Sequence, residues 1–275
     1  MIKRIMYLVI VLLLIWVVAS FTRAIFSPKG GTTTNKVIIG HRGGAGLGLE
    51  NSLECIEKGI AAGASSIEID VHLTADNQVV VCHDPTLDRT TNCKGSINEL
   101  TLYQIKQARL IDKNGIVTEQ TIPTLAEVLN TINNRVELLL EIKRIRGNNK
   151  GIELAVLNIL RQHDALGYTA IQSFDDSVLE TLHTLDPSLK LEKLLFGKLL
   201  GLPIIFDGTL NLFSLEKYSY ITSFNFYHTA LSAQLSHDLH KKGYKTRIWT
   251  VNELTDIRNI KIDGIITDRP DKMCK

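Results

Sequence analysis

The chain has 275 residues, of which 44% are hydrophobic and 22% are charged, and this composition excludes a disordered or fibrous protein. Lysine and arginine together number 31 and aspartate and glutamate 29, and the balance turns slightly acidic once the basic N-terminal segment is set aside. No basic surface for nucleic acid is therefore expected, and nucleic acid is not among the predicted partners.

The first 26 residues are predicted to be a signal peptide or a membrane anchor. Residues 5–20, IMYLVIVLLLIWVVAS, contain no charge and follow two basic residues. This run is shorter than the roughly 20 residues that a membrane span prefers, and Val17 and Ala19 could form a cleavage site. The residues that follow, up to position 26, could instead extend a retained anchor. The folded domain is thus expected to be anchored on the non-cytoplasmic side of a membrane, or exported.

Residues 27–35, SPKGGTTTN, lack apolar periodicity and are predicted to be a linker to a folded domain over 36–275. In that domain short apolar runs alternate with longer helical patterns. Eight runs are predicted strands: Val37–Gly40, Ser66–His72, Val136–Ile142, Thr169–Ser173, Lys190–Leu195, Ser219–Phe224, Lys245–Thr250 and Gly264–Thr267. Helical stretches between them include Ser52–Ala62 and Leu231–Lys242, each followed by a glycine that can end a helix. Alternation on this scale predicts a (β/α)8 TIM barrel.

One stretch interrupts the alternation. The segment Asp84–Ile122 is too long for a simple loop after the second strand, and a further strand-like run, Gln78–Cys82, precedes it. It is predicted to be a small insertion on the mouth of the barrel.

Acidic residues occur where the predicted strands end, which is the functional end of such a barrel. In the second strand, SSIEIDVHL, the period of two places Glu68 and Asp70 on one face. The third strand contributes Glu141, which a neighbouring strand could bring within reach of the same cation. Three carboxylates favour a hard cation, Mg²⁺ or Ca²⁺ with Mn²⁺ possible, over zinc.

Basic residues accompany the acids at the same strand ends. With a divalent cation bound, three carboxylates leave the site negative, so an anionic ligand needs Arg42 and Lys143 as well. Charge balance then favours a phosphodiester. His41 and His83 come from different strand ends and can supply the proton acceptor and donor of a phosphoryl transfer.

These residues lie in motifs that resemble the glycerophosphodiester phosphodiesterase family. HRGGAGLGLENS and EIDVHLTADNQVVVCHDPTLDRTTN resemble its catalytic and metal motifs, and IPTLAEVL, LLLEIK, QSFD, WTVN and DGIITDRPD follow in the family's order. The resemblance covers about Lys36 to Asp271. Leu49 stands where the family usually has proline, which affects loop rigidity more than chemistry.

The resemblance implies a role for each residue of the site. It implies that Glu68, Asp70 and Glu141 hold the metal, that His41 and His83 are the acid/base pair, that Arg42 and Lys143 contact phosphate, that Glu50 supports His41, and that Phe174 and Trp249 line the pocket wall. It also implies attack by a glycerol hydroxyl on the phosphate, giving a cyclic phosphate that water opens to glycerol 3-phosphate.

Two alternatives stay open. The same residues could act as a lysophospholipase D on a substrate that retains an acyl chain, and the apolar residues 198–213 could form a lip for that chain. A binding module for phosphate compounds that has lost catalysis is less favoured, because binding alone does not require two histidines. The expected partners are a small-molecule phosphodiester or lysophospholipid and, through the N-terminus, a membrane; the oligomeric state is left open.

Overall fold

The computed structural model describes residues 36–143, 151–198, 205–206, 212–253 and 260–274. The predicted membrane segment 1–26 and linker 27–35 lie outside this part, as does most of the predicted lip at 198–213, so all three stay predictions. Among the described residues, no helix combines the length and the apolar character that crossing a membrane requires.

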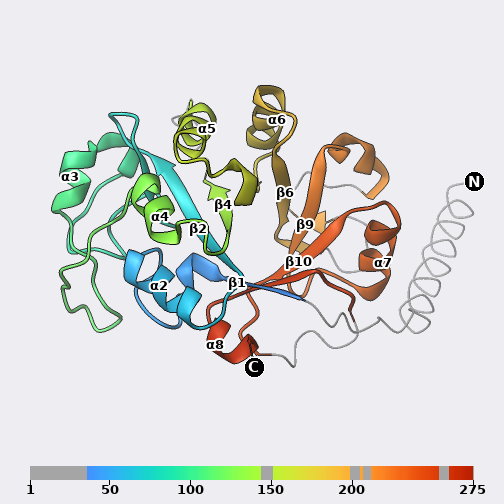
Figure 1. Cartoon of the computed structure of the whole chain (residues 1–275), viewed down its shortest axis with the longest axis horizontal. Helices are drawn as coiled ribbons and strands as arrows, with labels where there is room; N and C mark the ends of the chain where they lie inside the picture. The colour runs from blue at the N-terminus through green and yellow to red at the C-terminus, as the bar shows by residue number, and fades with distance from the viewer. Residues whose placement is uncertain (1–35, 144–150, 199–204, 207–211, 254–259, 275) are drawn as a thin grey trace, which may run out of the picture.

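The described strands close a barrel of eight parallel strands (Figure 1). They are β1 (Val37–Gly40), β2 (Ser66–Leu73), β4 (Glu137–Ile142), β5 (Thr169–Ser173), β6 (Lys190–Leu195), β9 (Ile221–Tyr227), β10 (Lys245–Trp249) and β11 (Gly264–Thr267). The ring closes because β1 pairs with both β2 and β11. The predicted barrel is therefore confirmed for the described residues.

The sixth strand differs from its prediction. It was expected at Ser219–Phe224, but β9 begins two residues later and extends to Tyr227. Its start is displaced because a 3-10 helix, η4 (Leu212–Tyr218), runs directly up to the preceding turn. Its end is extended because both neighbouring strands continue to pair with it, up to Tyr227 opposite Trp249 on β10.

Helices surround the barrel and bury one face each against it (Figure 1). They are α2 (Leu53–Ala61), α4 (Leu125–Ile132), α5 (Ile152–Gln162), α6 (Asp176–Leu185), α7 (Ala233–Lys241) and α8 (Pro270–Met273), with the 3-10 turn η3 (Leu166–Tyr168) before β5. The glycines predicted to end two of them, Gly63 and Gly243, have positive φ angles of 94° and 87°. That left-handed conformation is accessible to glycine at little cost and stops the helix.

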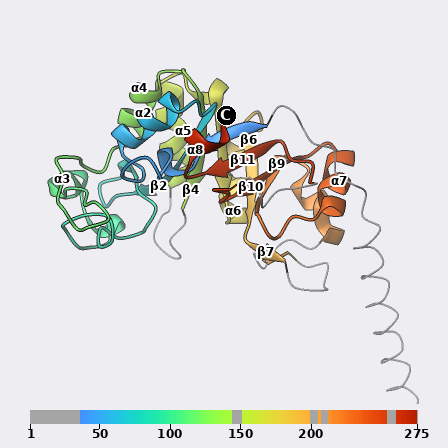
Figure 2. The same cartoon turned by 90° about the horizontal axis from the view of Figure 1, so that it is seen from below.

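An additional strand, β3 (Val79–Val81), pairs antiparallel with β2 and leads into the segment that precedes α4. This segment contains a 3-10 turn, η2 (Ile97–Glu99), and the short helix α3 (Leu102–Gln107). Its apolar side chains form a cluster separate from the main core. In two perpendicular views α3 and α7 lie at opposite ends of the molecule (Figures 1 and 2). A short hairpin of β7 (Gly197–Lys198) and β8 (Ile205–Phe206) follows β6.

Helix α2 packs closely on the turn that follows β1. Gly59 lies so near this turn that a Cβ there would overlap the carbonyl oxygen of Gly43. Absence of a side chain at Gly59 therefore allows the helix to support η1 (His41–Gly43), the turn from which two predicted site residues project.

We expect Gly59→Ala to lower the free energy of unfolding by about 1–3 kcal/mol, because overpacking forces backbone to shift. Urea denaturation measures the change. Gly167→Ala is the matched control, since nothing lies within 4 Å of a Cβ at Gly167. An equal loss of stability in both variants would contradict the close approach at Gly59 as the cause of the effect.

Candidate active site

The turn after β1 has a strained backbone, and this conformation places a hydrogen-bond donor beside the neighbouring strand. Arg42 has a φ of 50°, a left-handed conformation that is unfavourable for a residue with a side chain. In this conformation its backbone N–H donates to Glu68 Oε2 at 2.8 Å. The strained turn thereby supplies a fixed hydrogen bond to a buried carboxylate on β2.

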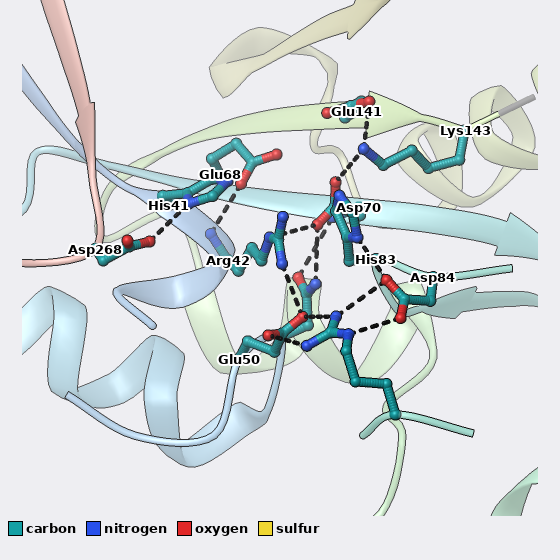
Figure 3. A network of polar contacts seen from close by, with 12 residues as sticks. His41, Arg42, Glu50, Glu68, Asp70, His83, Asp84, Glu141, Lys143 and Asp268 are labelled. Carbon is teal, nitrogen blue, oxygen red and sulfur yellow. Dashed lines mark hydrogen bonds and ion pairs between the residues drawn. The ribbon is translucent and has the colours of Figure 1, made fainter. Parts of the chain in front are cut away.

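Three carboxylates from β2 and β4 meet where these two strands pair (Figure 3). Glu68 and Asp70 are each 1% exposed and Glu141 is 6% exposed. Asp70 and Glu141 are direct partners in the parallel pairing of the two strands. One oxygen from each of the three carboxylates lies within 4.8 Å of the others. The structure thus brings together all three predicted metal ligands.

Positive and polar groups surround this cluster. Lys143 Nζ lies 2.6 Å from Glu141 Oε1 and 3.0 Å from Asp70 Oδ1. Arg42 Nε lies 3.7 Å from Asp70 Oδ2, to which Asn51 Nδ2 also donates at 2.9 Å. Lys143 and Arg42, the predicted phosphate contacts, therefore also border the acids.

Ionisation of the cluster reflects burial and a shortage of positive charge. Burial raises the pKa of Glu68 well above its ordinary value, and the charges of Asp70 and Glu141 raise it further. Burial also raises the pKa of Glu141 to about 7, although Lys143 opposes the rise. Burial acts in the same direction on Asp70, but nearby positive charges, led by Lys143, outweigh it and lower the pKa of Asp70. A divalent cation would supply the missing charge, and these oxygen ligands fit Mg²⁺, Ca²⁺ or Mn²⁺.

The two predicted catalytic histidines each pair with a carboxylate. His41 Nδ1 lies 2.6 Å from Asp268 Oδ1, and His83 Nδ1 lies 2.7 Å from Asp84 Oδ1. Because a carboxylate only accepts, each histidine donates from Nδ1 and leaves Nε2 for another partner. Asp268 also accepts from Asn252 Nδ2 at 2.8 Å. Burial lowers the pKa of His83, which favours its neutral form.

A cavity of about 320 Å³ joins these groups. Its lining has a charged side with His41, Arg42, Glu68, His83, Glu141 and Lys143, and an apolar side with Phe174, Leu194, Phe196, Trp249 and Ile266. The rings of Phe174 and Trp249, the predicted pocket wall, meet edge to face with centroids 5.7 Å apart. One end of the cavity thus suits an anion and the other an apolar group.

Glu50 lies in a different place from the one predicted. It was expected beside His41, but its Oε1 accepts from Arg42 Nη1 at 3.0 Å, and both of its oxygens accept from Arg89. The preceding turn directs the side chain toward the segment after β3, which sequence spacing did not reveal. Glu50 therefore contacts the site through Arg42.

Sequence reasoning missed a hydrogen-bonded chain inside the barrel. Gln172 Nε2 donates to Glu68 Oε1 at 3.4 Å, and Gln172 Oε1 accepts from Asn225 Nδ2 at 2.8 Å. Asn225 Nδ2 also donates to Glu192 Oε2 at 2.7 Å, and Glu192 pairs with Arg247 at 2.8 Å. Because Glu192 only accepts, this order directs the NH₂ group of Gln172 toward Glu68.

Asp268 and Asp84 were also missed as partners of the histidines. Asp84 directly follows His83, so its position in the sequence was a usable signal. Asp268 follows the last strand in DGIITDRPD, a segment noted only for its resemblance.

Comparison with known proteins decides the family. Residues 41–272 match the model of the glycerophosphoryl diester phosphodiesterase family. The chain belongs to this family. It is accordingly a phosphoric diester hydrolase. A glycerophosphodiester phosphodiesterase from Caldanaerobacter subterraneus subsp. tengcongensis is 33% identical over 242 residues, covering 86% of this chain and 96% of the relative.

Two further proteins that this chain resembles have names that give a product or an activity. An Oleispira antarctica phosphodiesterase, solved in complex with the product sn-glycerol-3-phosphate, superposes with a TM-score of 0.76 at 26% identity and covers 86% of this chain and 94% of its own. A human lysophospholipase D is 25% identical over 269 residues, covering 86% of this chain and 84% of the relative.

We expect divalent-cation binding to tighten as pH rises from 6 to 8. Glu141, with a pKa raised to about 7, must lose its proton before it can serve as a ligand. One such group changes the affinity by about tenfold over this interval. Isothermal titration with Mg²⁺ and Ca²⁺ in buffers of different ionisation enthalpy measures both the affinity and the proton released.

Glu141→Gln should weaken binding by at least about tenfold and reduce the pH dependence, leaving the part that comes from Glu68. Glu137→Gln on the same strand is the control, because Glu137 is exposed at its opposite end. Affinity that is independent of pH in the unmodified protein would contradict the assignment of Glu141 as a ligand that releases a proton.

Proposed function

We propose that this protein hydrolyses glycerophosphodiesters to glycerol 3-phosphate and an alcohol, with His41 and His83 as the acid/base pair. The observation that carries the proposal is the lining of one cavity by both histidines, two of the three clustered carboxylates, Arg42 and Lys143. The third carboxylate, Asp70, contacts both basic residues. A diester phosphate bound between Arg42 and Lys143 would lie next to both histidines.

The carboxylates that accept from the two histidines differ in how far other residues compensate their negative charge. Asp84, which accepts from His83, is also bound by the guanidinium of Arg89, so its negative charge is largely compensated. Asp268, which accepts from His41, has the neutral amide of Asn252 as its other side-chain partner. With the lowered pKa of His83, this asymmetry favours His83 as the group that takes the proton of the attacking hydroxyl. His41 then protonates the leaving alcohol. In the second step His41 takes a proton from the attacking water, and His83 returns its proton to the glycerol oxygen that leaves the phosphorus.

The cation would be held by Glu68, Asp70 and Glu141. When bound, it supplies positive charge that stabilises the phosphoryl oxygens and orients the attacking hydroxyl. The protein's own side chains position the substrate. Arg42 and Lys143 hold the phosphate, and the apolar side of the cavity accommodates part of the substrate away from water.

His41→Ala and His83→Ala are each expected to lower kcat/KM for glycerophosphocholine by about 10² to 10⁴, because each removes one proton transfer. Release of glycerol 3-phosphate, followed by a coupled dehydrogenase assay, measures the loss. The pH profile of the unmodified enzyme should be bell-shaped between pH 5 and 9.

The control is His163→Ala, a histidine on the loop after α5 that is not part of the cavity lining. Equilibrium dialysis with glycerophosphocholine separates catalysis from binding. Substrate that binds to the unmodified protein with its metal but is never hydrolysed would identify a binding module and refute the enzymatic proposal.

A lysophospholipase D activity is a second candidate, favoured by the apolar side of the cavity. Phe196 is 58% exposed at this side, although it stacks on Tyr227 with ring centroids 5.6 Å apart and also meets Trp249. Exposed aromatic surface next to the charged side could contact the first methylenes of an acyl chain. The human relative named as a lysophospholipase D supports this candidate.

We expect the protein to cleave a short-chain lysophosphatidylcholine below the critical micelle concentration of this lipid. We expect Phe196→Ser to reduce the preference of the enzyme for lysophosphatidylcholine over glycerophosphocholine. Each methylene that loses its contact costs about 0.8 kcal/mol, so two of them give a change of roughly tenfold in the ratio of kcat/KM values. Tyr103→Ser, at a position 76% exposed on α3, is the control. An unchanged ratio in Phe196→Ser would eliminate the acyl-chain role and leave the soluble diester as substrate.

A further inference from the structure

The segment after β3 contains an arginine that connects two parts of the active site. Arg89 Nε donates to Asp84 Oδ2 at 2.7 Å and its Nη2 to Asp84 Oδ1 at 3.0 Å. The same guanidinium donates from Nη1 to Glu50 Oε2 at 2.8 Å and from Nη2 to Glu50 Oε1 at 2.7 Å. Arg89 thus binds two carboxylates, each in the two-point geometry that a planar guanidinium allows and an ammonium does not. These four hydrogen bonds are called the Arg89 bridge below.

Each carboxylate of the Arg89 bridge also holds a residue of the proposed mechanism. Glu50 Oε1 accepts from Arg42 Nη1 at 3.0 Å, and Asp84 Oδ1 accepts from His83 Nδ1 at 2.7 Å. In both cases the shared oxygen is one that Arg89 also binds. Figure 3 shows Glu50 beneath Arg42 and Asp84 beside His83, with the dashed contacts that connect them.

The residues that the bridge connects come from different parts of the chain. Arg42 and Glu50 belong to the turn after β1, whereas His83, Asp84 and Arg89 follow β3. Loops of this kind shift relative to one another unless contacts fix them. The bridge supplies such a contact on the side of the site where both loops reach solvent.

Together with Arg42, which pairs with Glu50, the charges around the bridge balance, two arginines against two carboxylates, and this suits a contact that is partly exposed. The Arg89 side chain is 48% exposed, and an isolated ion pair at such a position contributes little to stability. The hydrogen bonds that Arg89 donates to Glu50 and then to Asp84 raise the pKa of Arg89, and those that Asp84 accepts from Arg89 lower the pKa of Asp84. Burial raises the pKa of Glu50, but Arg89 and Arg42 outweigh burial and lower it. All three groups are therefore charged near neutral pH, and their geometry is fixed by several bonds at once.

We infer that Arg89 is a positioning residue that sets the separation of Arg42 and His83, so that phosphate binding and proton transfer act on the same substrate. The inference rests on the proposed function. It predicts that loss of the bridge affects two parameters together: KM through Arg42 and kcat through His83. A contact that only stabilised the fold would lower the amount of active enzyme and leave KM unchanged.

The test compares Arg89→Ala, Arg89→Lys and Arg109→Ala in the full chain with its divalent metal. Arg89→Ala should lower kcat/KM for glycerophosphocholine by about 10- to 100-fold, since displacement of about 1 Å costs this much. Arg89→Lys keeps the positive charge without the two-point geometry, so it should recover only a small part of the kcat/KM that Arg89→Ala loses. Arg109 is the matched control, because it lies in the same segment and its guanidinium donates to main-chain carbonyls of that segment.

Two further measurements separate positioning from folding. Guanidinium ion added at millimolar concentration should restore part of the activity of Arg89→Ala and none in Arg109→Ala. Asp84→Asn combined with Arg89→Ala should lose less than the product of the two single losses, because both changes interrupt the same bridge.

The inference is overturned if Arg89→Ala retains kcat and KM within about twofold, if Arg109→Ala loses as much as Arg89→Ala, or if guanidinium rescues neither parameter. Failure of the proposed function gives a different result, in which the unmodified protein hydrolyses no glycerophosphodiester. Calorimetry with glycerol 3-phosphate then tests the bridge alone: weaker binding to Arg89→Ala than to Arg109→Ala supports it, and equal binding overturns it.

Discussion

Burial of three carboxylates within 4.8 Å of one another is the constraint on which the rest of the site depends. Like charges removed from water repel strongly, so they persist only with protons, cations or hydrogen-bond donors beside them. The fold supplies several donors: the backbone N–H of the strained Arg42, the amides of Asn51 and Gln172, and the ammonium of Lys143. The raised pKa values of Glu68 and Glu141 show that these donors do not compensate the charge completely. A cluster left short of positive charge is suited to a cation and, with basic residues at its border, to a bound phosphate.

The barrel interior is organised by the same constraint. An apolar interior would stabilise the fold at least as well as the buried pair of Glu192 and Arg247, because removing two charges from water is costly. In this chain the pair determines the orientation of Asn225, and through it the orientation of Gln172. Reversing the Gln172 amide would turn its oxygen toward Glu68 and add repulsion to the cluster. The buried ion pair thus has a role in the site: through Asn225 it directs the NH₂ group of Gln172 toward Glu68.

Much of the fold could be predicted from the sequence because strand signals are local. Alternation with a period of two indicated that Glu68 and Asp70 share a face, and the parallel pairing of successive strands placed Glu141 opposite Asp70. The partners of the site residues depend on distances between loops, about which local patterns carry no information. Glu50 was therefore assigned to the wrong neighbour, and the role of Asp268, 227 positions from His41, was not recognised.

Strand pairing sets where the backbone of His83 lies relative to the carboxylate cluster, and the Arg89 bridge then positions the His83 side chain through Asp84. β3 is antiparallel to β2, and the N–H of Cys82 donates to the carbonyl of Asp70 at 2.9 Å. The next residue is His83, so a histidine from outside the barrel is held beside a carboxylate of the barrel by main-chain hydrogen bonds. Pairing of this kind resists displacement more than a loop does, because the ladder moves as one unit. The long segment after β3 can therefore vary in its outer parts, where α3 lies, while the backbone of His83 keeps its place beside the cluster.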